Sequence, residues 1–366
     1  MCRGMLAEPH EHPPRLAWGT QIQAQPQALG SKGRSPLKLF DFLCVAKPRK
    51  ETRVAYFVGY YGFGNAGDEH LLRQAKKLIA AERSYVLPPR RLWGLWDVAR
   101  RVPFVDTVVF GGGSLFQDKS SFLSMVYYLL ILSWACLWRR DVRILGHGFG
   151  PVRSRFLSRW LAMLLPHVDR LVARDSQSYT DFLALGSRHV CTVLGADLAY
   201  VSGLKKDLYV DDGLVAVSVN GAVLQVFESA LSEAATESGS CDFLWIAMHE
   251  GYDETRAPHV RMCDGLSLDE VGANIRFRAC ISMRYHACVW ASLRGIPFLA
   301  VGDDPKLQAL AHIFGQPVLS LRNSAQVVQA EMHDFLEKRE TYRVCLLAAR
   351  PAVLADAKNL VRCYRD

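Results

Sequence analysis

The chain has 366 residues, of which 50% are hydrophobic and 22% are charged, so the composition excludes a disordered protein. That length predicts about two globular domains. The net charge of +8 is concentrated at the start, because residues 1–53 contain nine Lys and Arg against four Asp and Glu. The remaining chain carries little excess charge, and we expect no nucleic-acid partner.

The ten cysteines are scattered and include no Cys-x-x-Cys pair. This spacing argues against a disulfide framework and against a zinc site, and it favours reduced, buried thiols. Residues 1–33 are polar and Pro-rich without an apolar core, so we expect no secretory signal. These features together predict a cytoplasmic protein.

Residues 1–52 are predicted to form an irregular basic extension, because they show no sustained periodicity. Two interpretations stay open. The segment is either a solvated tail or wrongly assigned start, or it contacts a membrane surface or a partner.

Residues 122–138 form an apolar run of 17 residues followed by two arginines. The run is at the lower limit for crossing a bilayer and contains two serines. It also lies between two predicted strands of one sheet. We therefore expect a buried or interfacial helix, with peripheral contact at the inner face of a membrane as the alternative.

From residue 53 onward, short apolar runs alternate with helical patterns. The first set of strands is expected at Val54–Val58, 105–110, 142–145, Arg170–Ala173 and Cys191–Leu194. The second set is expected at 214–219, 243–247, 280–283 and Phe298–Val301, with helices at 223–237, 286–293 and 306–314. Such alternation predicts parallel sheets with right-handed crossovers.

The charged, turn-rich segment 205–213 is the predicted boundary between two Rossmann-like halves that face a cleft. The expected organisation is an extension at 1–52, an N-terminal domain at 53–204, a C-terminal domain at 213–323 and a helical tail at 324–366. Pro351 is expected to break or kink that tail.

The first candidate loop, 59–69, follows the first strand and contains four glycines. Glycine allows tight turns and close approach of the backbone to a ligand, and a helix start favours an anion. Tyr61, Asn65 and Asp68 are candidate substrate-binding residues. Alternatively, Asp68 is only the helix N-cap.

The second candidate loop, 111–118, begins with three consecutive glycines directly after a strand. Such a run loses much chain entropy on folding, which suggests that a ligand or another backbone passes close by. Gly112, Gly113 and Ser114 are the candidate substrate-binding residues here.

Cationic side chains follow several other strands. Arg284 and His286 lie at a predicted strand-to-helix junction, where an Arg suits carboxylate or phosphate and a His can move a proton. Lys306 opens a predicted helix, where its charge opposes the helix dipole unless an anion is near. Arg174 follows another strand. In open α/β sheets, ligands bind beyond these strand ends.

An acidic cluster follows a strand of the second half. His249, Asp253 and Glu254 do not form a metalloprotease motif, and no metal site is expected. The cluster either supplies a general acid or base, or is a charged loop.

The motifs together resemble those of the polysaccharide pyruvyltransferases, including bacterial enzymes that pyruvylate cell-wall polymers. The similar segments are GYYGFGNAGDE (59–69), GGGSLFQD (111–118), GHGFGP (146–151), ARDSQSY (173–179), ADLAY (196–200) and SMRYHACVWASLRGIPFLAVGDDPK (282–306). The resemblance extends over residues 54–315.

This resemblance implies a GT-B-like fold and the transfer of pyruvate from phosphoenolpyruvate to a hexose or hexosamine of a cell-surface polysaccharide or its lipid-linked precursor. The product would be a ketal, with phosphate released and no metal or organic cofactor. The resemblance implies that Arg174, Arg284, His286 and Lys306 bind or activate the donor.

From these residues we hypothesise that His286 acts as an acid or stabilises the phosphate, and that Asp253 or Glu254 is the general base. The two Gly-rich loops would hold the acceptor. Two alternatives remain. A GT-B-like fold also suits a nucleotide-sugar glycosyltransferase, and a short segment between residues 197 and 282 would suit a non-catalytic family member that binds ligand or partner.

Overall fold

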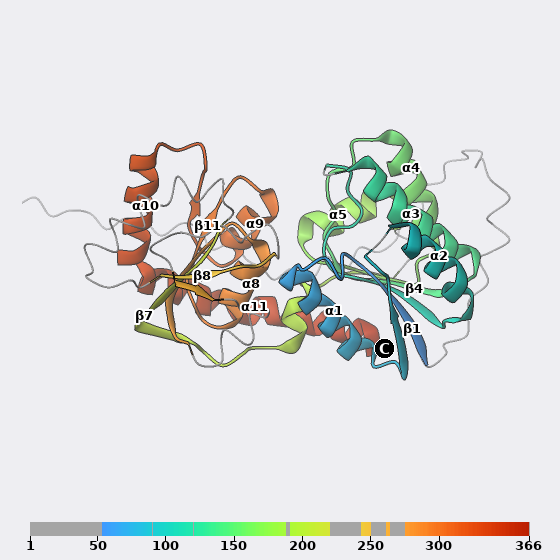
Figure 1. Ribbon diagram of the computed structural model, residues 1–366, viewed down its shortest axis with the longest axis horizontal. Helices are drawn as coiled ribbons and strands as arrows, with labels where there is room; N and C mark the ends of the chain where they lie inside the picture. The colour runs from blue at the N-terminus through green and yellow to red at the C-terminus, as the bar shows by residue number, and fades with distance from the viewer. Residues whose placement is uncertain are drawn as a thin grey trace, which may run out of the picture. The chain divides into compact units, whose positions relative to one another are not determined.

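The computed structural model describes residues 53–89, 91–119, 121–187, 191–219, 243–249, 261–263 and 275–365. All of them belong to one compact unit, Ala46–Asp366. Within these residues the chain forms two six-stranded sheets, and every strand pair is parallel. Figure 1 shows the helices packed around each sheet. The predicted α/β class with parallel sheets is therefore confirmed.

The first sheet has the strand order β2-β1-β3-β4-β5-β6. Its strands are β1 (Val54–Val58), β2 (Arg83–Val86), β3 (Thr107–Gly111), β4 (Asp141–His147), β5 (Arg170–Ala173) and β6 (Cys191–Leu194). Its helices are α1 (Ala66–Ile79), α2 (Arg91–Arg101), α3 (Phe122–Leu137), α4 (Arg155–Leu164) and α5 (Ser176–Ala184). The five predicted strands are confirmed, with shifted ends at β3 and β4. We missed β2, which is short and largely exposed and so lacks an apolar pattern.

The second sheet has the order β12-β11-β10-β7-β8-β9. Its strands are β7 (Tyr209–Ser218), β8 (Phe243–Ile246), β9 (Arg261–Cys263), β10 (Phe277–Ser282), β11 (Phe298–Val301) and β12 (Val318–Leu319). Helices α8 (Tyr285–Leu293) and α9 (Pro305–Ile313) confirm two predicted helices within one residue at each end. The predicted helix at 223–237 lies outside the described residues.

The strand predicted at 214–219 begins earlier, inside the segment 205–213 that we predicted as the domain boundary. Residues 209–213 form the first half of β7, although Asp211 and Asp212 are poor strand formers. Tertiary contacts compensate: Arg339 pairs with Asp211, and the Arg343 guanidinium stacks 4.2 Å from the centre of the Tyr209 ring. Because these partners lie more than 120 residues away, a local pattern could not reveal them.

Each sheet has a point where the strand order reverses. In the first sheet this point lies between β1 and β3, and in the second it lies between β7 and β10. Ligands of open α/β sheets bind beyond the carboxyl ends of the strands at such points. The loops that follow β1, β3 and β10 are 59–65, 112–121 and 283–284, so three of the predicted motifs sit at these reversals.

The tail forms two helices, α10 (Ala325–Glu337) and α11 (Arg339–Arg365). Pro351 lies inside α11 and does not end it, so a break at Pro351 is wrong, while the kink stays a prediction. Leu346 and Leu360, on either side of the proline, are both fully buried. Packing of both halves outweighs the loss of one backbone hydrogen bond. The end of α11 packs against β6, where Leu360 Cβ lies 3.3 Å from the position of a Cβ added at Gly195.

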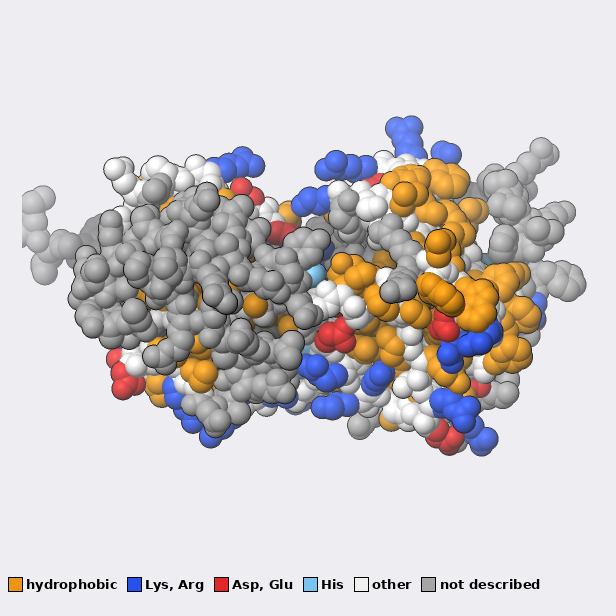
Figure 2. All heavy atoms as spheres, viewed as in Figure 1, with side chains coloured by type: hydrophobic (Ala, Val, Ile, Leu, Met, Phe, Trp, Pro, Cys, Tyr) orange, Lys and Arg blue, Asp and Glu red, His pale blue; other side chains and the backbone are white. Residues whose placement is uncertain are grey.

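Helix α3 confirms the prediction of a buried or interfacial helix for residues 122–138. Ser121 caps it by accepting a hydrogen bond from the Ser124 amide at 3.2 Å. One side packs into the core through residues such as Leu129 and Leu132, which are fully buried. Other side chains of α3 face outward beside α2 and α4, where Figure 2 shows hydrophobic surface. Among the described residues, no helix is both long and apolar enough to cross a bilayer.

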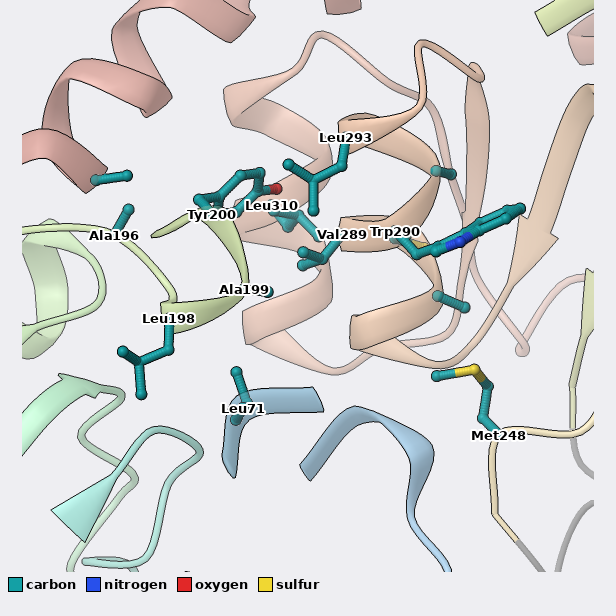
Figure 3. Packing of buried hydrophobic residues seen from close by; sticks show 14 of the residues in the cluster. Leu71, Ala196, Leu198, Ala199, Tyr200, Met248, Val289, Trp290, Leu293 and Leu310 are labelled. Carbon is teal, nitrogen blue, oxygen red and sulfur yellow. The ribbon is translucent and has the colours of Figure 1, made fainter. Parts of the chain in front are cut away.

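A single hydrophobic cluster joins elements of both sheets. It contains Leu71 of α1, Leu198 of the short helix η5 (Leu198–Ser202), and Val289 and Trp290 of α8. Figure 3 shows these side chains converging from the three elements. The Tyr200 and Ser292 hydroxyls, 2.8 Å apart, add a buried hydrogen bond across the same contact. Apolar burial therefore fixes α8 against the first half of the chain.

The cysteines whose side chains are described are free thiols, as predicted from their spacing. Three of them, Cys136, Cys280 and Cys288, are buried. Burial alone raises the pKa of Cys280 to about 12, so this thiol stays protonated and packs as an apolar group.

We predict that Leu360→Ala lowers the free energy of unfolding by about 2–5 kcal/mol, because it removes a fully buried side chain from the contact between α11 and the first sheet. Urea denaturation followed by circular dichroism measures this change. The neighbouring exposed residue provides the control: Asn359→Ala should stay within about 0.5 kcal/mol of the unmodified protein. Equal effects of both variants would show that α11 is not held by this contact.

Candidate active site

The loop after β1 is fixed by its own side chains. Asn65 is the N-cap of α1, and its Oδ1 accepts a hydrogen bond from the Gly67 amide at 3.1 Å. The Glu69 carboxylate accepts from the Gly62 amide at 2.6 Å. Asp68 is therefore not the cap, and the alternative of a purely capping role for it is wrong. Tyr61 is buried and donates to the Gly111 carbonyl at 2.7 Å, which ties this loop to the next.

The loop after β3 is held by a buried histidine. Gly112 and Gly113 have φ values of +76° and +72°, which favour glycine. The Leu115 amide donates to His147 Nε2 at 3.0 Å, so Nδ1 carries the ring proton and donates to the Gly112 carbonyl at 3.0 Å. Burial, with the nearby Arg174 charge, lowers the pKa of His147 to about 3, so the ring is neutral. His147 lies in the GHGFGP segment (146–151) but was not among the predicted site residues.

Arg174 follows β5, and only 6% of its side chain is exposed. Its Nε donates to Asp175 Oδ2 at 3.3 Å, and its Nη1 lies 3.9 Å from Asp197 Oδ2. Its guanidinium carbon lies 4.7 Å from the centre of the Tyr285 ring. Burial opposes the charge, but Tyr285, Asp197 and Asp175 offset it and raise the pKa of Arg174. The guanidinium is thus a permanent buried cation.

Asp197 joins the two halves of the candidate site. Its side chain is fully buried, and Oδ1 accepts from the Ala199 amide at 2.9 Å as the N-cap of η5. Its Oδ2 lies 3.9 Å from Nη1 of Arg174 and 3.9 Å from Nε2 of His286. We did not select Asp197 from the sequence. Its place shortly after β6, within the ADLAY segment (196–200), was the available signal.

His286 lies in the first turn of α8 and packs on the start of α1. A Cβ added at Gly67 would lie 2.3 Å from His286 Nδ1, so only glycine leaves room for the ring. Burial, together with the charges of Arg174 and Lys306, lowers the pKa of His286, while Asp197 acts in the opposite direction. The ring is therefore mainly neutral at pH 7.

Three buried polar atoms in this cluster have no hydrogen-bond partner within the described part of the chain: Ser114 Oγ, Asp197 Oδ2 and His286 Nε2. Ser114 Oγ and an Arg174 Nη atom both flank Gly148, lying 2.6 and 2.5 Å from the position of an added Cβ. Each buried polar atom left unpaired costs about 1–3 kcal/mol. Because native proteins rarely tolerate several together, the arrangement favours a polar ligand.

Lys306 adds a second cation to the cluster. It lies in the first turn of α9, half-buried, where Asp304 is the N-cap and accepts from the Lys306 amide at 3.0 Å. Burial is the main cause that lowers the pKa of Lys306, and the like charge of Arg174 lowers it further. A bound anion would relieve this repulsion.

Asp68 is the group poised to exchange a proton. Burial, followed by the charges of Asp197 and Glu69, raises the pKa of Asp68 from 3.8 to about 7, against the opposing effect of Lys306. Its Oδ1 lies 3.7 Å from the position of a Cβ added at Gly113, so the carboxyl group faces the second Gly-rich loop. Near neutral pH this carboxyl can both donate and accept a proton.

The structure describes few side-chain contacts for the remaining predicted residues, which are Arg284, His249, Asp253 and Glu254. Arg284 is the N-cap of α8, as its position after β10 predicts, and its amide donates to Ser282 Oγ at 2.9 Å. The strand segment containing His249 forms an isolated bridge with Asn65, so it reaches the start of α1. Asp253 and Glu254 lie outside the described residues. Within the described ranges, no group of three or more acidic, His or Cys side chains could hold a metal ion.

The cluster thus brings together side chains from both sheets: Asp68, Ser114, Arg174, Asp197, Tyr285, His286 and Lys306. It combines two cations, unpaired hydrogen-bonding atoms and a carboxyl group that titrates near neutral pH. This combination suits binding of a small anion and transfer of a proton to or from it.

Comparison with known proteins decides the family. The sequence model of the family described as polysaccharide pyruvyl transferase matches residues 41–305 of this chain. The chain belongs to this family. It is therefore a transferase that acts in polysaccharide pyruvylation, and this assignment replaces the alternative of a nucleotide-sugar glycosyltransferase. No curated protein sequence matches the chain.

Solved structures show the fold of this pyruvyl transferase. A UDP-GlcNAc 2-epimerase from Neisseria meningitidis, bound to UDP-GlcNAc, is 12% identical with a TM-score of 0.57, covering 84% of this chain and 98% of its own. MnaA from S. aureus, in a structure with UDP, is 10% identical with a TM-score of 0.53, covering 82% of this chain and 92% of its own. At these identities the likeness establishes the fold alone, which is GT-B-like as predicted.

We predict that His147→Ala destabilises the pyruvyl transferase by about 2–5 kcal/mol, because it leaves the Leu115 amide and the Gly112 carbonyl unpaired in the interior. Thermal and urea unfolding measure the loss. The matched control is His333→Ala, since 61% of the His333 side chain is exposed and its removal should change stability by less than about 0.5 kcal/mol. Unchanged stability of His147→Ala would rule out the clamping role.

Proposed function

We propose that this chain transfers pyruvate from phosphoenolpyruvate to a hexose or hexosamine unit of a cell-surface polysaccharide or its lipid-linked precursor. The reaction would form a ketal and release phosphate. The observation that carries the proposal is the buried cluster in which Arg174 and Lys306 lie close enough to perturb each other, beside three unpaired polar atoms. Phosphoenolpyruvate would bring negative charge to Lys306 and oxygens that can accept from Ser114 Oγ and His286 Nε2.

The donor would be held by charge-assisted contacts. Arg174 and Lys306 would neutralise its carboxylate and phosphate, and Arg284 would approach from the start of α8. Ser114 Oγ and His286 Nε2 would supply hydrogen bonds to donor oxygens, since both atoms are buried and unpaired. The proposal requires neither a metal nor an organic cofactor.

Protonation of the donor methylene is assigned to Asp68 in place of His286, our first choice from the sequence. The pKa of His286 is lowered by burial, which favours the neutral ring, whereas the pKa of Asp68 is raised to about 7. At neutral pH the Asp68 carboxyl group is therefore more often protonated than the His286 ring, so it is the better proton donor. His286 then stabilises the phosphate by donating a hydrogen bond to one of its oxygens.

The proposed steps balance as follows. Asp68 gives its proton to the methylene carbon, which becomes a methyl group, and C2 becomes electrophilic. One acceptor hydroxyl attacks C2, and its proton goes to a base. The C2–O bond to phosphate then breaks, with the electron pair leaving on phosphate. The second hydroxyl attacks C2 to close the ketal, and its proton goes to the Asp68 carboxylate, which restores the acid. Asp253 or Glu254 remains our candidate for the base, and the two Gly-rich loops, with Asn65, Gly112 and Gly113, remain the candidate acceptor wall.

We predict that Arg174→Ala, Arg284→Ala and His286→Ala each reduce phosphate release from phosphoenolpyruvate by more than tenfold, because each removes a donor contact. Lys306→Ala should mainly raise the KM for the donor. Phosphate release with a panel of free and lipid-linked hexosamine acceptors measures both constants. Phosphoenolpyruvate should also raise the melting temperature, while UDP-GlcNAc should not.

The control for these variants is Arg322→Ala, because 87% of the Arg322 side chain is exposed and its pair with Asp303 lies at the surface. It should retain full activity. Wild-type rates for both Arg174→Ala and His286→Ala would refute the site, and stabilisation by UDP-GlcNAc in place of phosphoenolpyruvate would refute the donor.

We predict that kcat/KM falls about tenfold per pH unit above pH 7, because the acid must be protonated and the pKa of Asp68 is about 7. Asp68→Asn should lower kcat by about 10²–10⁴-fold with little change in donor affinity. A pH profile of Asp68→Asn that keeps the same descending limb would remove Asp68 from the acid role.

Stability provides an independent check on the same carboxyl group. Its folded-state pKa lies above the unfolded value of 3.8, so the folded protein keeps a proton that the unfolded chain releases. Stability from this group is therefore full below pH 4 and is lost as pH rises towards 7. The variant Asp68→Asn has no such loss of stability. The difference between its melting temperature and that of the unmodified protein should therefore be more positive at pH 8 than at pH 4.

A further inference from the structure

The largest feature that the proposed function does not explain is an apolar face on the first half of the chain. Of the exposed large hydrophobic side chains among the described residues, more than half lie between Leu92 and Met163. They include Trp93, Trp96, Phe104, Leu123, Leu130 and Phe156. We refer to the outer surface of α2, the short helix η2 (Val102–Phe104), α3 and α4 as the α2–α4 face.

These helices form one continuous surface. Helix α3 packs against α2, η2 and α4, and the Trp160 indole of α4 donates to Ser133 Oγ of α3 at 3.1 Å. Figures 1 and 2 show the three helices and the hydrophobic side chains that gather over them, with Lys and Arg nearby. Soluble proteins rarely expose large contiguous apolar patches unless they bind something there.

Helix α4 shows that this exposure follows a pattern. Leu157, Leu161 and Leu164 form one stripe and are buried. Phe156 and Met163 are 64% and 47% exposed and lie on the outer side of the same helix. A helix that only covers a core needs one apolar stripe with a polar opposite side. The second stripe of α4 therefore has a different partner.

The charges of the face identify that partner. Exposed arginines accompany the apolar side chains at Arg100, Arg139, Arg153, Arg155 and Arg159. Helices α3 and α4 contain no acidic residue, and Asp97 of α2 is buried against Arg101. Surfaces that lie in the interface of an anionic bilayer combine Trp, Phe and Leu with Arg and lack acidic residues. The α2–α4 face has this composition.

Two other occupants fit the charges less well. A second copy of the chain would place arginines against arginines across a two-fold axis. The extension 1–52 is itself basic, with its Lys and Arg outnumbering its Asp and Glu, and would be repelled. We propose that the α2–α4 face docks this pyruvyl transferase on an anionic lipid surface.

The α2–α4 face lies close to the loops of the candidate active site, so docking would help the reaction. This step of the inference rests on the proposed function. The first residues of α3 and α4 follow the strand ends that carry the Gly-rich loop 111–118 and the 146–151 motif. The Asp118 carboxylate accepts from the Arg153 and Ser154 amides at 2.9 and 2.8 Å, which joins these two loops. Docking would bring the strand-end edge of the sheet to a saccharide anchored in lipid.

The test is cosedimentation of the full chain with vesicles, without donor or acceptor. We expect binding to vesicles of phosphatidylcholine with 30% phosphatidylglycerol, little binding to pure phosphatidylcholine, and weakening at high salt. The triple variant Trp93→Ser, Leu123→Ser, Phe156→Ser should weaken binding at least tenfold. The triple variant Arg153→Gln, Arg155→Gln, Arg159→Gln should weaken it on the order of 100-fold, at about fivefold per charge.

The matched apolar control is Ile313→Ser, Val327→Ser, Val344→Ser, since these side chains are exposed on other helices and should leave binding unchanged. Absence of binding to the anionic vesicles, or equal loss in the control, would overturn the proposal. A different outcome would assign the face to a second copy of the chain. The unmodified protein would then sediment as a dimer and bind no vesicles, and only the variant at Trp93, Leu123 and Phe156 would be monomeric.

Activity separates this inference from the proposed function. The apolar triple variant should keep the wild-type rate of phosphate release with a soluble acceptor and lose at least tenfold with a lipid-linked acceptor in vesicles. Vesicle binding without any phosphate release would refute the function and leave the docking surface intact. Equal activity of the variant on both acceptors would refute docking as part of the reaction.

Discussion

A positive charge enclosed in protein has to be balanced within a few ångströms, and the guanidinium of Arg174 imposes this requirement on the whole site. Its partners come from separate parts of the chain: Asp175 from the same loop, Asp197 from the end of β6 and Tyr285 from α8. Removing any one would leave the guanidinium less compensated. The contact between the two sheets is therefore electrostatic at the site and hydrophobic beside it, where Leu71, Leu198 and Val289 pack together.

The glycines and His147 make that convergence geometrically feasible. Gly67 leaves room for the His286 ring on the start of α1, and Gly148 leaves room for the Arg174 guanidinium. Neutral His147 closes the turn after β3 with one donated and one accepted hydrogen bond. Because its pKa is lowered to about 3, the ring cannot become a competing cation at neutral pH, and the positive charge stays with Arg174 and Lys306.

The free protein keeps these charges in an unfavourable balance, which is typical of binding sites. Arg174 lowers the pKa of Lys306, and Asp197 raises the pKa of Asp68. Each of these pairs consists of two groups of like charge, and their closeness costs stability. An anion would compensate the cations. It would also raise the pKa of Asp68 further, keeping the proposed acid protonated when the donor is present.

The sequence alone determined the alternation of strands and helices, because apolar periodicity and glycine-rich strand ends are local properties. It also selected Arg174, His286 and Lys306, since cationic residues directly after strands are visible in the order of residues. Asp68 was selected as a ligand-binding residue, but its raised pKa, on which its proposed role as an acid rests, depends on burial near Asp197, 129 positions later. Asp197 and His147 lie within the segments ADLAY and GHGFGP, but nothing in the order of residues distinguished them as site residues. Asp211 lies in the predicted boundary segment but belongs to β7, and Pro351 does not break α11. Only the tertiary structure decided these points. A pKa, an ion pair, or a strand or helix that continues through an unfavourable residue depends on which groups folding brings together.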